Sequence, residues 1–552
     1  MQREKFFFFM FPPLQEARPA GCGSPRRPQS VVPMPRAGCK RGGHGGRCGA
    51  VAMQGLRGER CGTALQYVTF CRAKGMVLQA KRYGFAVQNV TFLLSSERQW
   101  VAHTSAVASR CVPRARLGGR KGIGFCAQSG KKGYLCRRIM DYKTTTLSNG
   151  LRVIMLPSAS PVVYCGYEVA AGTSDERPGE EGLAHFCEHV AFKGTARRTA
   201  MDVINSLETV GGELNAFTTK TDTVYYAAIL REHLPRAVDL LSDIVFRSVY
   251  PQREIDKEVE VICDEIESYN DTPSDLIFDE FENLVFARTP LGHNILGTAE
   301  RVRSFATEDA LRFTRRLYRP DNAVFFASGD ISFGRLVALL CEALGTCESA
   351  SPAPKAEDAA AWPPFSNDCA GKTIRRHRHT HQAHVMVGRR GYPVAHPLRM
   401  ALYLLNNILG GPGMNSRLNL SLRERNGLVY TVESTSINYA RAGLWSVYFG
   451  CDHADVERCL ALVRQELDAF VERPLTEEQL ERARQQIKGQ IALACDNRES
   501  FAIDFGKSFL HYGRERDIER LYRAIDAVTA ADIQAVAKEL FAPEGLTTLI
   551  YE

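Results

Sequence analysis

Two histidines and a glutamate lie within five residues of one another in the stretch GLAHFCEHVAFKGT (182–195). His185 and His189 are four residues apart, and Glu188 directly precedes the second histidine. Residues four apart lie one turn along the same face of a helix, so both imidazoles and the carboxylate would share one side. The opposite side would be apolar and suited to packing, and consists of Leu183, Phe186, Cys187 and Val190.

This helical face has the chemistry of a hydrolytic zinc site. Imidazole nitrogens four residues apart can both reach one tetrahedral ion at about 2.0–2.1 Å. Glu188 need not be a ligand, and could take a proton from metal-activated water as a general base. The alternative is a solvated helix surface, on which His and Glu are common. A catalytic zinc also needs a third protein ligand, which must come from elsewhere in the chain.

A second helix with a carboxylate face is predicted in the stretch EIDKEVEVICDEIESYNDTPSDLIFDEF, which begins at Glu254. Glu258 and Glu265 are seven residues apart, so they lie on nearly one face, two turns from each other. The other side has apolar residues at helical spacing, namely Ile255, Val259, Ile262 and Ile266. The stretch therefore offers a carboxylate ligand, although an acidic helix of this kind could also be simply solvated.

The elements that would position these groups alternate between strands and helices without the rhythm of a parallel βαβ fold, which predicts an α+β fold. Residues 144–172 alternate like paired strands around a turn at Asn149-Gly150, and residues 211–230 have the pattern of two further strands. Helices are expected to start near residues 182, 200 and 232, and a long one is expected from about 252 to 270.

Two blocks of similar length are predicted, separated by the Pro- and Ala-rich residues 350–366, which we interpret as a linker. The segment 307–331 aligns with the segment 529–552, and Asp309 and Asp532 each lie 11 residues before a proline. This match predicts a duplicated domain. The expected domains are residues 140–349, which hold the histidine motif, and residues 367–552.

The first 139 residues differ in composition from the rest. They hold 25 Lys and Arg residues against four Glu and no Asp, a net charge of +21, whereas the remainder carries −13. Eight of the 17 cysteines also lie there, among many Gly, Pro and Arg residues. Such a segment cannot bury enough apolar surface to offset its ordering entropy, so residues 1–139 are expected to be a disordered or non-native extension.

Several explanations of this extension stay open. Its arginine content and lack of acidic residues are typical of a transit peptide, and a basic arm can bind nucleic acid. The opening MQREKFFFFMFPP is similar to a secretion signal, but its apolar run is short and ends in two prolines. The favoured explanation is that translation begins at Met140. The nine cysteines beyond it form no CxxC pair, which fits a reducing compartment.

Together these motifs resemble the pitrilysin-type inverzincin metallopeptidases. Within them, the chain is similar to the short two-domain branch typified by the mitochondrial processing peptidase β subunit and its bacterial relatives. The similarity runs from about residue 141 to residue 552, and includes NGLRV, GLAHFCEHVAFKGT, GGELNAFT, VICDEIESYNDTP and SLRERNGLVYTV. It implies two homologous domains, each a mainly antiparallel sheet packed with helices, joined as a clamshell.

The resemblance also implies roles in the catalytic centre. His185, His189 and Glu265 would be the ligands of one zinc ion per chain. Glu188 would be the general base, and Glu258 would orient a ligand from behind.

Further roles implied by the resemblance concern the substrate. Arg423 and Tyr430, which are seven residues apart, would contact it, and Tyr430 would help to stabilise the oxyanion. Asn215, Ala216 and Phe217 would lie on an edge strand that binds the substrate backbone by strand addition.

The expected function is that of a zinc-dependent metalloendopeptidase that hydrolyses extended peptides or presequences. The alternative is a non-catalytic partner or core subunit of a related heteromeric complex, although such subunits have usually lost HxxEH or the third ligand. The expected partners are a peptide substrate and a second copy in a homodimer, with no nucleic acid and no membrane. The expected location is the cytoplasm, or the mitochondrial matrix if the extension is real.

Overall fold

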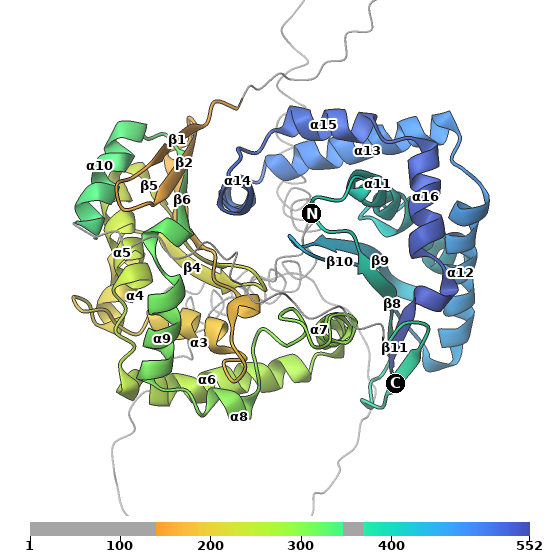
Figure 1. Cartoon of the computed structure of the whole chain (residues 1–552), viewed down its shortest axis with the longest axis horizontal. Helices are drawn as coiled ribbons and strands as arrows, with labels where there is room; N and C mark the ends of the chain where they lie inside the picture. Colours follow the sequence, from red (N-terminus) through yellow and green to blue (C-terminus); the bar gives the residue numbers. More distant parts are fainter. Residues whose placement is uncertain (1–139, 346–367) are drawn as a thin grey trace, which may run out of the picture. The chain divides into compact units, whose positions relative to one another are not determined.

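The computed structural model describes residues 140–345 and 368–552, which form two β-sheets with their covering helices (Figure 1). The predicted extension (1–139) and the predicted linker (350–366) lie outside the described residues, so the domain limits stay predictions. Within the described residues, no helix is both long and apolar enough to cross a membrane.

The first sheet has six strands in the order β1-β2-β6-β3-β5-β4. Its strands are β1 (Lys143–Thr146), β2 (Arg152–Pro157), β3 (Val162–Val169), β4 (Glu213–Thr218), β5 (Thr223–Leu230) and β6 (Ala323–Gly329). The helices of this half are α3 (Leu183–Ala191), α4 (Ala200–Glu208), α5 (Leu234–Phe246), α6 (Gln252–Asn270), α7 (Pro273–Val285), α8 (Ala299–Val302), α9 (Thr307–Leu317) and α10 (Phe333–Leu344). The strands and helices predicted between residues 144 and 270 are therefore present, within a few residues of the expected limits.

The first hairpin shows why the predicted turn holds. β1 pairs antiparallel with β2, and Gly150 between them has φ +87°, a left-handed conformation that glycine adopts without strain. A Cβ on Gly150 would also lie 2.8 Å from the Cβ of Asp321, closer than atoms normally pack. The Asn149 side chain accepts a hydrogen bond from the backbone N–H of Leu151 and so stabilises the turn.

The second sheet has five strands in the order β7-β11-β8-β10-β9. Its strands are β7 (Thr373–Arg376), β8 (Ala383–Gly391), β9 (Val429–Asn438), β10 (Gly443–Cys451) and β11 (Thr547–Tyr551). The helices of this half are α11 (Arg399–Gly410), α12 (Val456–Glu472), α13 (Glu477–Cys495), α14 (Arg498–Tyr512), α15 (Ile518–Asp526) and α16 (Ala530–Leu540). A π-helical segment, Asn419–Arg425, precedes β9.

The two sheets share one topology. The order β2-β6-β3-β5-β4 corresponds strand by strand to β7-β11-β8-β10-β9. The pairs β2-β6 and β7-β11 are parallel, and all other pairs, including the additional β1-β2 pair of the first sheet, are antiparallel. The aligned ends also agree, because α9 and α16 both carry an aspartate at the third position that accepts from the N-cap backbone, and each is followed by β6 or β11. The α+β fold and the duplication are therefore confirmed, with one parallel pair in each sheet.

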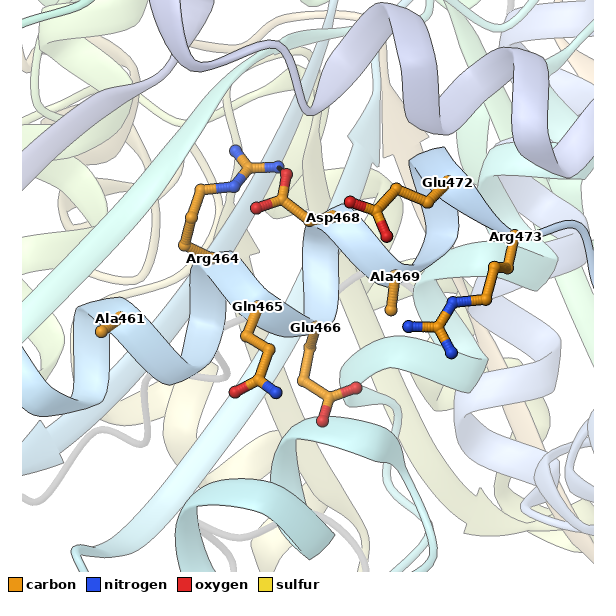
Figure 2. A pocket seen from close by; sticks show the side chains of 8 residues that line it. All are labelled: Ala461, Arg464, Gln465, Glu466, Asp468, Ala469, Glu472 and Arg473. Atoms are coloured by element: carbon orange, nitrogen blue, oxygen red, sulfur yellow. Dashed lines mark hydrogen bonds and ion pairs between the residues drawn. The ribbon is translucent and has the colours of Figure 1, made fainter.

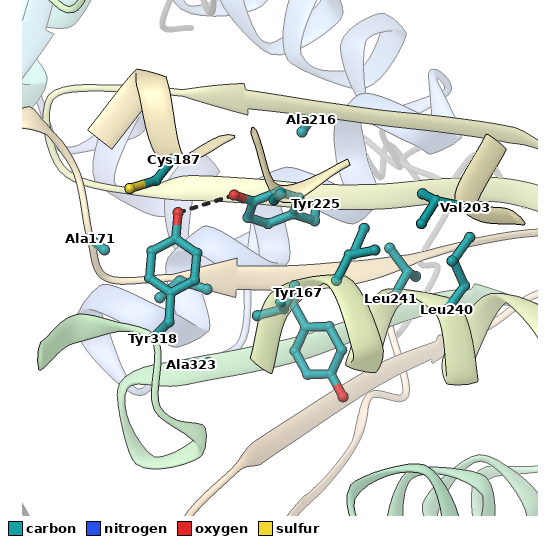
Figure 3. Close-up of a cluster of buried hydrophobic side chains, with 14 of the residues drawn as sticks. Tyr167, Ala171, Cys187, Val203, Ala216, Tyr225, Leu240, Leu241, Tyr318 and Ala323 are labelled. Carbon is teal, nitrogen blue, oxygen red and sulfur yellow. Dashed lines mark hydrogen bonds between the residues drawn. The ribbon is translucent and has the colours of Figure 1, made fainter. Parts of the chain in front are cut away.

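The core of the first half packs the helices against the sheet, and Figure 3 shows part of it. Tyr225 on β5 and Tyr318 after α9 are both buried, and their hydroxyls lie 3.1 Å apart in a hydrogen bond. Tyr167 on β3 is also buried and shares a 2.8 Å hydrogen bond with the Ser242 hydroxyl. Because each buried hydroxyl has a partner, these large aromatic rings can enter the core without the penalty of an unsatisfied polar group.

Each sheet also packs against a helix from the other half. Phe501 and Phe505 of α14 belong to the buried cluster that includes Phe326 of the first sheet. Phe281 of α7 belongs to the cluster that includes Leu549 of the second sheet. The two halves are therefore joined by shared hydrophobic cores as well as by the chain itself.

Candidate metal centre and catalytic site

The helix α3 that carries the histidine motif begins at a built cap. The buried Glu176 carboxylate accepts hydrogen bonds from the backbone N–H groups of Gly182 (3.0 Å) and Ala184 (2.8 Å), which have no partner within the helix. Gly182 has φ +94°, and a Cβ there would lie 2.8 Å from the Cα of Gly297. The glycine before the motif therefore lets the chain turn sharply into the helix.

Three side chains from α3 and α6 meet at one point. His189 Nε2 lies 3.1 Å from the Glu265 carboxylate, and His185 Nε2 lies 3.8 Å from the same oxygen. One ligand atom from each of the three lies within 4.8 Å of the other two, and no other such group occurs in residues 140–345 and 368–552. Both histidines are buried, which contradicts the alternative of a solvated helix surface.

The donor set fits zinc. Two imidazole nitrogens and one carboxylate oxygen are the ligands of many catalytic zinc sites, and they leave a fourth position open for water or substrate. Glu258 accepts a hydrogen bond from His189 Nδ1 at 3.1 Å, and Nε2 of the same ring faces the other two candidate ligands. Glu265 therefore lies within this group of candidate ligands and Glu258 lies behind it, while their roles toward a metal stay predictions.

Burial and neighbouring charges shift the pKa values of the two histidines in opposite directions. Burial and the neighbouring His189 lower the pKa of His185 to about 4. Burial opposes protonation of His189 as well, but hydrogen bonds to Glu258 and Glu265 prevail and raise its pKa to about 9. One imidazole is thus neutral and the other carries a proton between two carboxylates, a position that a bound cation would take over.

Glu188 lies on the same helix face and is fully buried in the first half. Burial raises its pKa to about 7, against the opposing effects of His189 and of a hydrogen bond from Thr218. The Thr218 hydroxyl, at the end of β4, donates that bond at 2.6 Å to Glu188 Oε2. A carboxyl group with a pKa near neutrality can both accept and return a proton, which suits a general acid and base.

The proposed substrate strand β4 is the edge of the first sheet. Asn215 and Ala216 pair with Tyr226 and Tyr225 of β5, and the other edge of β4 has no neighbouring strand among the described residues. Ala216 and Phe217 are buried, and Asn215 is half-buried. The backbone is therefore placed for strand addition, while the binding of substrate there stays a prediction.

Arg423 and Tyr430 lie together in the second half. Arg423 belongs to the π-helical segment and Tyr430 to β9, and the guanidinium carbon lies 5.8 Å from the centre of the tyrosine ring. The Tyr430 side chain is 75% exposed, unlike a packed core aromatic. Arg423 and Tyr430 therefore lie side by side, and their part in the reaction stays a prediction.

A cavity of about 450 Å³ runs along α12 in the second half (Figure 2). It is lined by Ala461, Arg464, Gln465, Glu466, Asp468, Ala469, Glu472 and Arg473. An ion pair between Arg464 and Asp468 at 2.6 Å joins two of these residues. The lining includes none of the candidate ligands, so this cavity is separate from the metal centre.

Two copies of one α+β fold, with HxxEH on a helix of the first copy and a glutamate from a following helix, define the architecture of an inverzincin metallopeptidase. Residues 152–299 match the family described as insulinase (peptidase family M16), and residues 304–487 match the peptidase M16 inactive domain. The chain belongs to peptidase family M16, the pitrilysin-type metallopeptidases.

Its relatives include an uncharacterized zinc protease of Streptomyces coelicolor, 34% identical over 72% of this chain and 87% of the relative. Another uncharacterized zinc protease, from Bacillus subtilis, is 31% identical over 74% of this chain and 98% of the relative. Among solved structures, the peptidase M16 inactive domain from Pseudomonas fluorescens has a TM-score of 0.67 at 18% identity, covering 75% of this chain and 98% of that one. A protease from Helicobacter pylori has a TM-score of 0.66 at 21% identity, with coverages of 75% and 99%. These two structures support the fold alone.

Two residues that contact the candidate site were not predicted from the sequence. Thr218 donates to Glu188, and Lys193 lies 2.6 Å from Glu258. Thr218 is the last residue of the GGELNAFT motif, and Lys193 follows the histidine helix. Neither spacing nor residue type marks them, because their contacts depend on how α3, α6 and β4 pack together.

Proposed function

We propose that the chain is a zinc-dependent endopeptidase with one zinc per chain, held by His185, His189 and Glu265. The observation that supports this most is the meeting of these three side chains, of which the two histidines are buried, beside the buried Glu188 carboxylate. The side chains of a surface cluster would all be exposed, whereas here His185, Glu188 and His189 are buried and the Glu265 side chain is 22% exposed.

Zinc held there would supply a Lewis acid, which lowers the pKa of water toward neutrality and polarises the peptide carbonyl. Glu188 would accept the proton of the attacking water and later return it to the leaving amine. Thr218 would hold the Glu188 carboxylate by its 2.6 Å hydrogen bond. Glu258 would fix the orientation of the His189 ring through Nδ1.

The substrate class follows from the edge of β4. An extended peptide can add to this edge by main-chain hydrogen bonds, which do not depend on side-chain identity. We therefore propose extended, unfolded peptides or presequences as substrates, with Asn215, Ala216 and Phe217 at the contact. Arg423 and Tyr430 would contact the same peptide from the second half.

The assembly and location are also proposals. Both the histidine motif and the Arg423–Tyr430 pair belong to one chain, which supports a homodimer with two complete sites. The relatives in Streptomyces and Bacillus support a cytoplasmic enzyme of bacterial type.

The experiment is cleavage of a peptide library by the full chain, purified with zinc, then treated with a chelator, then given zinc or magnesium. Cleavage that is lost with the chelator and returns with zinc but not with magnesium is the expected result. A chain that holds zinc at one ion per chain and cleaves nothing would instead favour the non-catalytic subunit.

A further inference from the structure

The Glu258 carboxylate contacts two side chains, His189 and Lys193, and only His189 is a candidate metal ligand. Its Oε1 accepts from His189 Nδ1 at 3.1 Å, and its Oε2 lies 2.6 Å from the ammonium nitrogen of Lys193. The Glu258 side chain is 5% exposed and that of Lys193 is 16% exposed. Both carboxylate oxygens therefore have a partner inside the fold.

The position of Lys193 is itself fixed by the end of α3. Its backbone N–H bonds to the carbonyl of Val190, and Gly194 after it has φ +144°, which directs the chain away from the helix. Gly194 and Thr195 then form single bridges to Thr199 and Ser248. The lysine side chain thus starts from an anchored backbone just after the end of α3 and reaches across to α6.

A buried carboxylate is stable in the fold only when its charge is compensated. A cation bound by His189 Nε2 would act on Glu258 only across the imidazole ring, whereas Lys193 contacts the carboxylate directly. Lys193 thus holds the second carboxylate oxygen, so that the first stays directed at His189 Nδ1.

We propose that Lys193 is a positioning residue for the metal centre, acting through Glu258 to hold the His189 ring in its ligating orientation. This inference rests on the proposed metal site, because it concerns how well that site holds zinc. It predicts an effect on zinc affinity that passes entirely through Glu258.

The test is the zinc dissociation constant of the full chain, measured by competition with a chromophoric chelator, for Lys193→Met, Lys193→Gln and Lys193→Arg. Removal of the charge should weaken zinc binding by about 10–100-fold, the range for outer partners of metal-bound histidines. Lys193→Arg should stay within about threefold of wild type, because it keeps a cation within reach of Glu258.

A matched control is Lys257→Met, which also removes one lysine charge beside α6. Lys257 pairs with Glu254 at 2.7 Å, but its side chain is 58% exposed and lies on the surface. The zinc affinity of the Lys257→Met variant should equal that of the wild type. Thermal unfolding of each variant without added zinc identifies any that fail to fold. Lys193→Met and Lys193→Gln both remove the charge, so the test can be made if either of them folds.

A double-mutant cycle with Glu258→Gln separates positioning from general damage. If Lys193 acts through Glu258, adding Lys193→Met to Glu258→Gln should weaken zinc binding by less than about twofold further. Wild-type affinity in Lys193→Met, or a full additional loss in the double variant, would overturn this role while leaving the proposed peptidase intact. A wild-type chain that binds no zinc would overturn both, whereas zinc binding without peptide cleavage would overturn only the peptidase.

Discussion

Individual side chains define the chemistry, and the central ones come from two helices. His185, Glu188 and His189 share one face of α3, while Glu258 and Glu265 share one face of α6. Helical spacing alone was enough to predict both faces. It could not show that the faces meet, because that depends on the packing of α3 against α6.

At the residue scale, the role of Glu265 is tested by its removal. Glu265→Ala should lower the zinc content well below one ion per chain, because two imidazoles alone leave the geometry of the ion undefined. Metal analysis after exhaustive dialysis measures this. Full zinc occupancy with ordinary cleavage would mean that another group is the third ligand. Glu260, an exposed acidic residue on the same helix, offers Glu260→Ala as the control.

Thr218 gives a second prediction at this scale. Thr218→Val keeps the side-chain shape but removes the hydroxyl that donates to Glu188 at 2.6 Å. We expect kcat to fall by about tenfold or more with little change in KM, because the general base loses its orientation and one hydrogen bond. Thr218→Ser should recover most of the rate. Equal kcat in the Val and wild-type proteins would show that the hydroxyl does not position the base.

At the scale of elements, the hairpin of β4 and β5 links the general base to the second half. Thr218 contacts Glu188 where β4 ends, and Asp222 lies four residues further, in the turn. Asp222 is fully buried and accepts from Lys507 (2.9 Å) and His511 (3.2 Å) on α14. The edge strand proposed to bind substrate is thus fixed at its turn by a helix of the other half.

Asp222→Asn tests this link. Burial opposes ionisation, but Lys507 and His511 hold the pKa of Asp222 well below its usual range. Because its pKa is lower in the folded than in the unfolded chain, ionised Asp222 stabilises the fold at pH values above the ordinary aspartate pKa of about 3.9. This contribution to the free energy of unfolding is lost progressively as the pH falls below that value. Removing the charge should cost on the order of 3 kcal/mol at pH 7, because the positive charge of Lys507 loses its buried carboxylate counter-charge.

Denaturant unfolding at pH 7 and pH 3 measures the difference in the free energy of unfolding between Asp222→Asn and wild type. This difference should be smaller at pH 3. Asp526→Asn, at an exposed pair with Lys488, is the control and should have little effect at either pH. A variant as stable as wild type at pH 7 would show that this ion cluster does not join the halves. No sequence pattern predicted this cluster, because Asp222 lies 285 residues before Lys507 and 289 residues before His511.

At the scale of the whole molecule, the duplicated fold was predictable and the packing between its copies was not. The match of 307–331 to 529–552 identified equivalent helix–strand units, α9–β6 and α16–β11. That α14 packs on the first sheet and α7 on the second depends on long-range contacts that no local pattern encodes. The same limit applies to Arg423 and Tyr430, whose spacing says nothing of their distance from the zinc ligands.

Tyr430→Phe tests whether the second half takes part in the reaction. Loss of one hydroxyl donor to the oxyanion should lower kcat/KM by roughly 100-fold, with zinc content unchanged. A value within about threefold of wild type would confine the chemistry to the first half. If the chains of a homodimer exchange this element, mixing Tyr430→Phe with Glu188→Gln protomers should restore one active site per dimer.

The most direct measurement is the turnover of a zinc-loaded Glu188→Gln chain on a peptide that the wild type cleaves. The substitution removes the proposed general base while leaving His185, His189 and Glu265 in place. We predict one zinc per chain and a rate at least ~10²–10⁴-fold below wild type. Turnover close to wild type in the zinc-loaded variant would contradict a hydrolytic site built on the HxxEH helix.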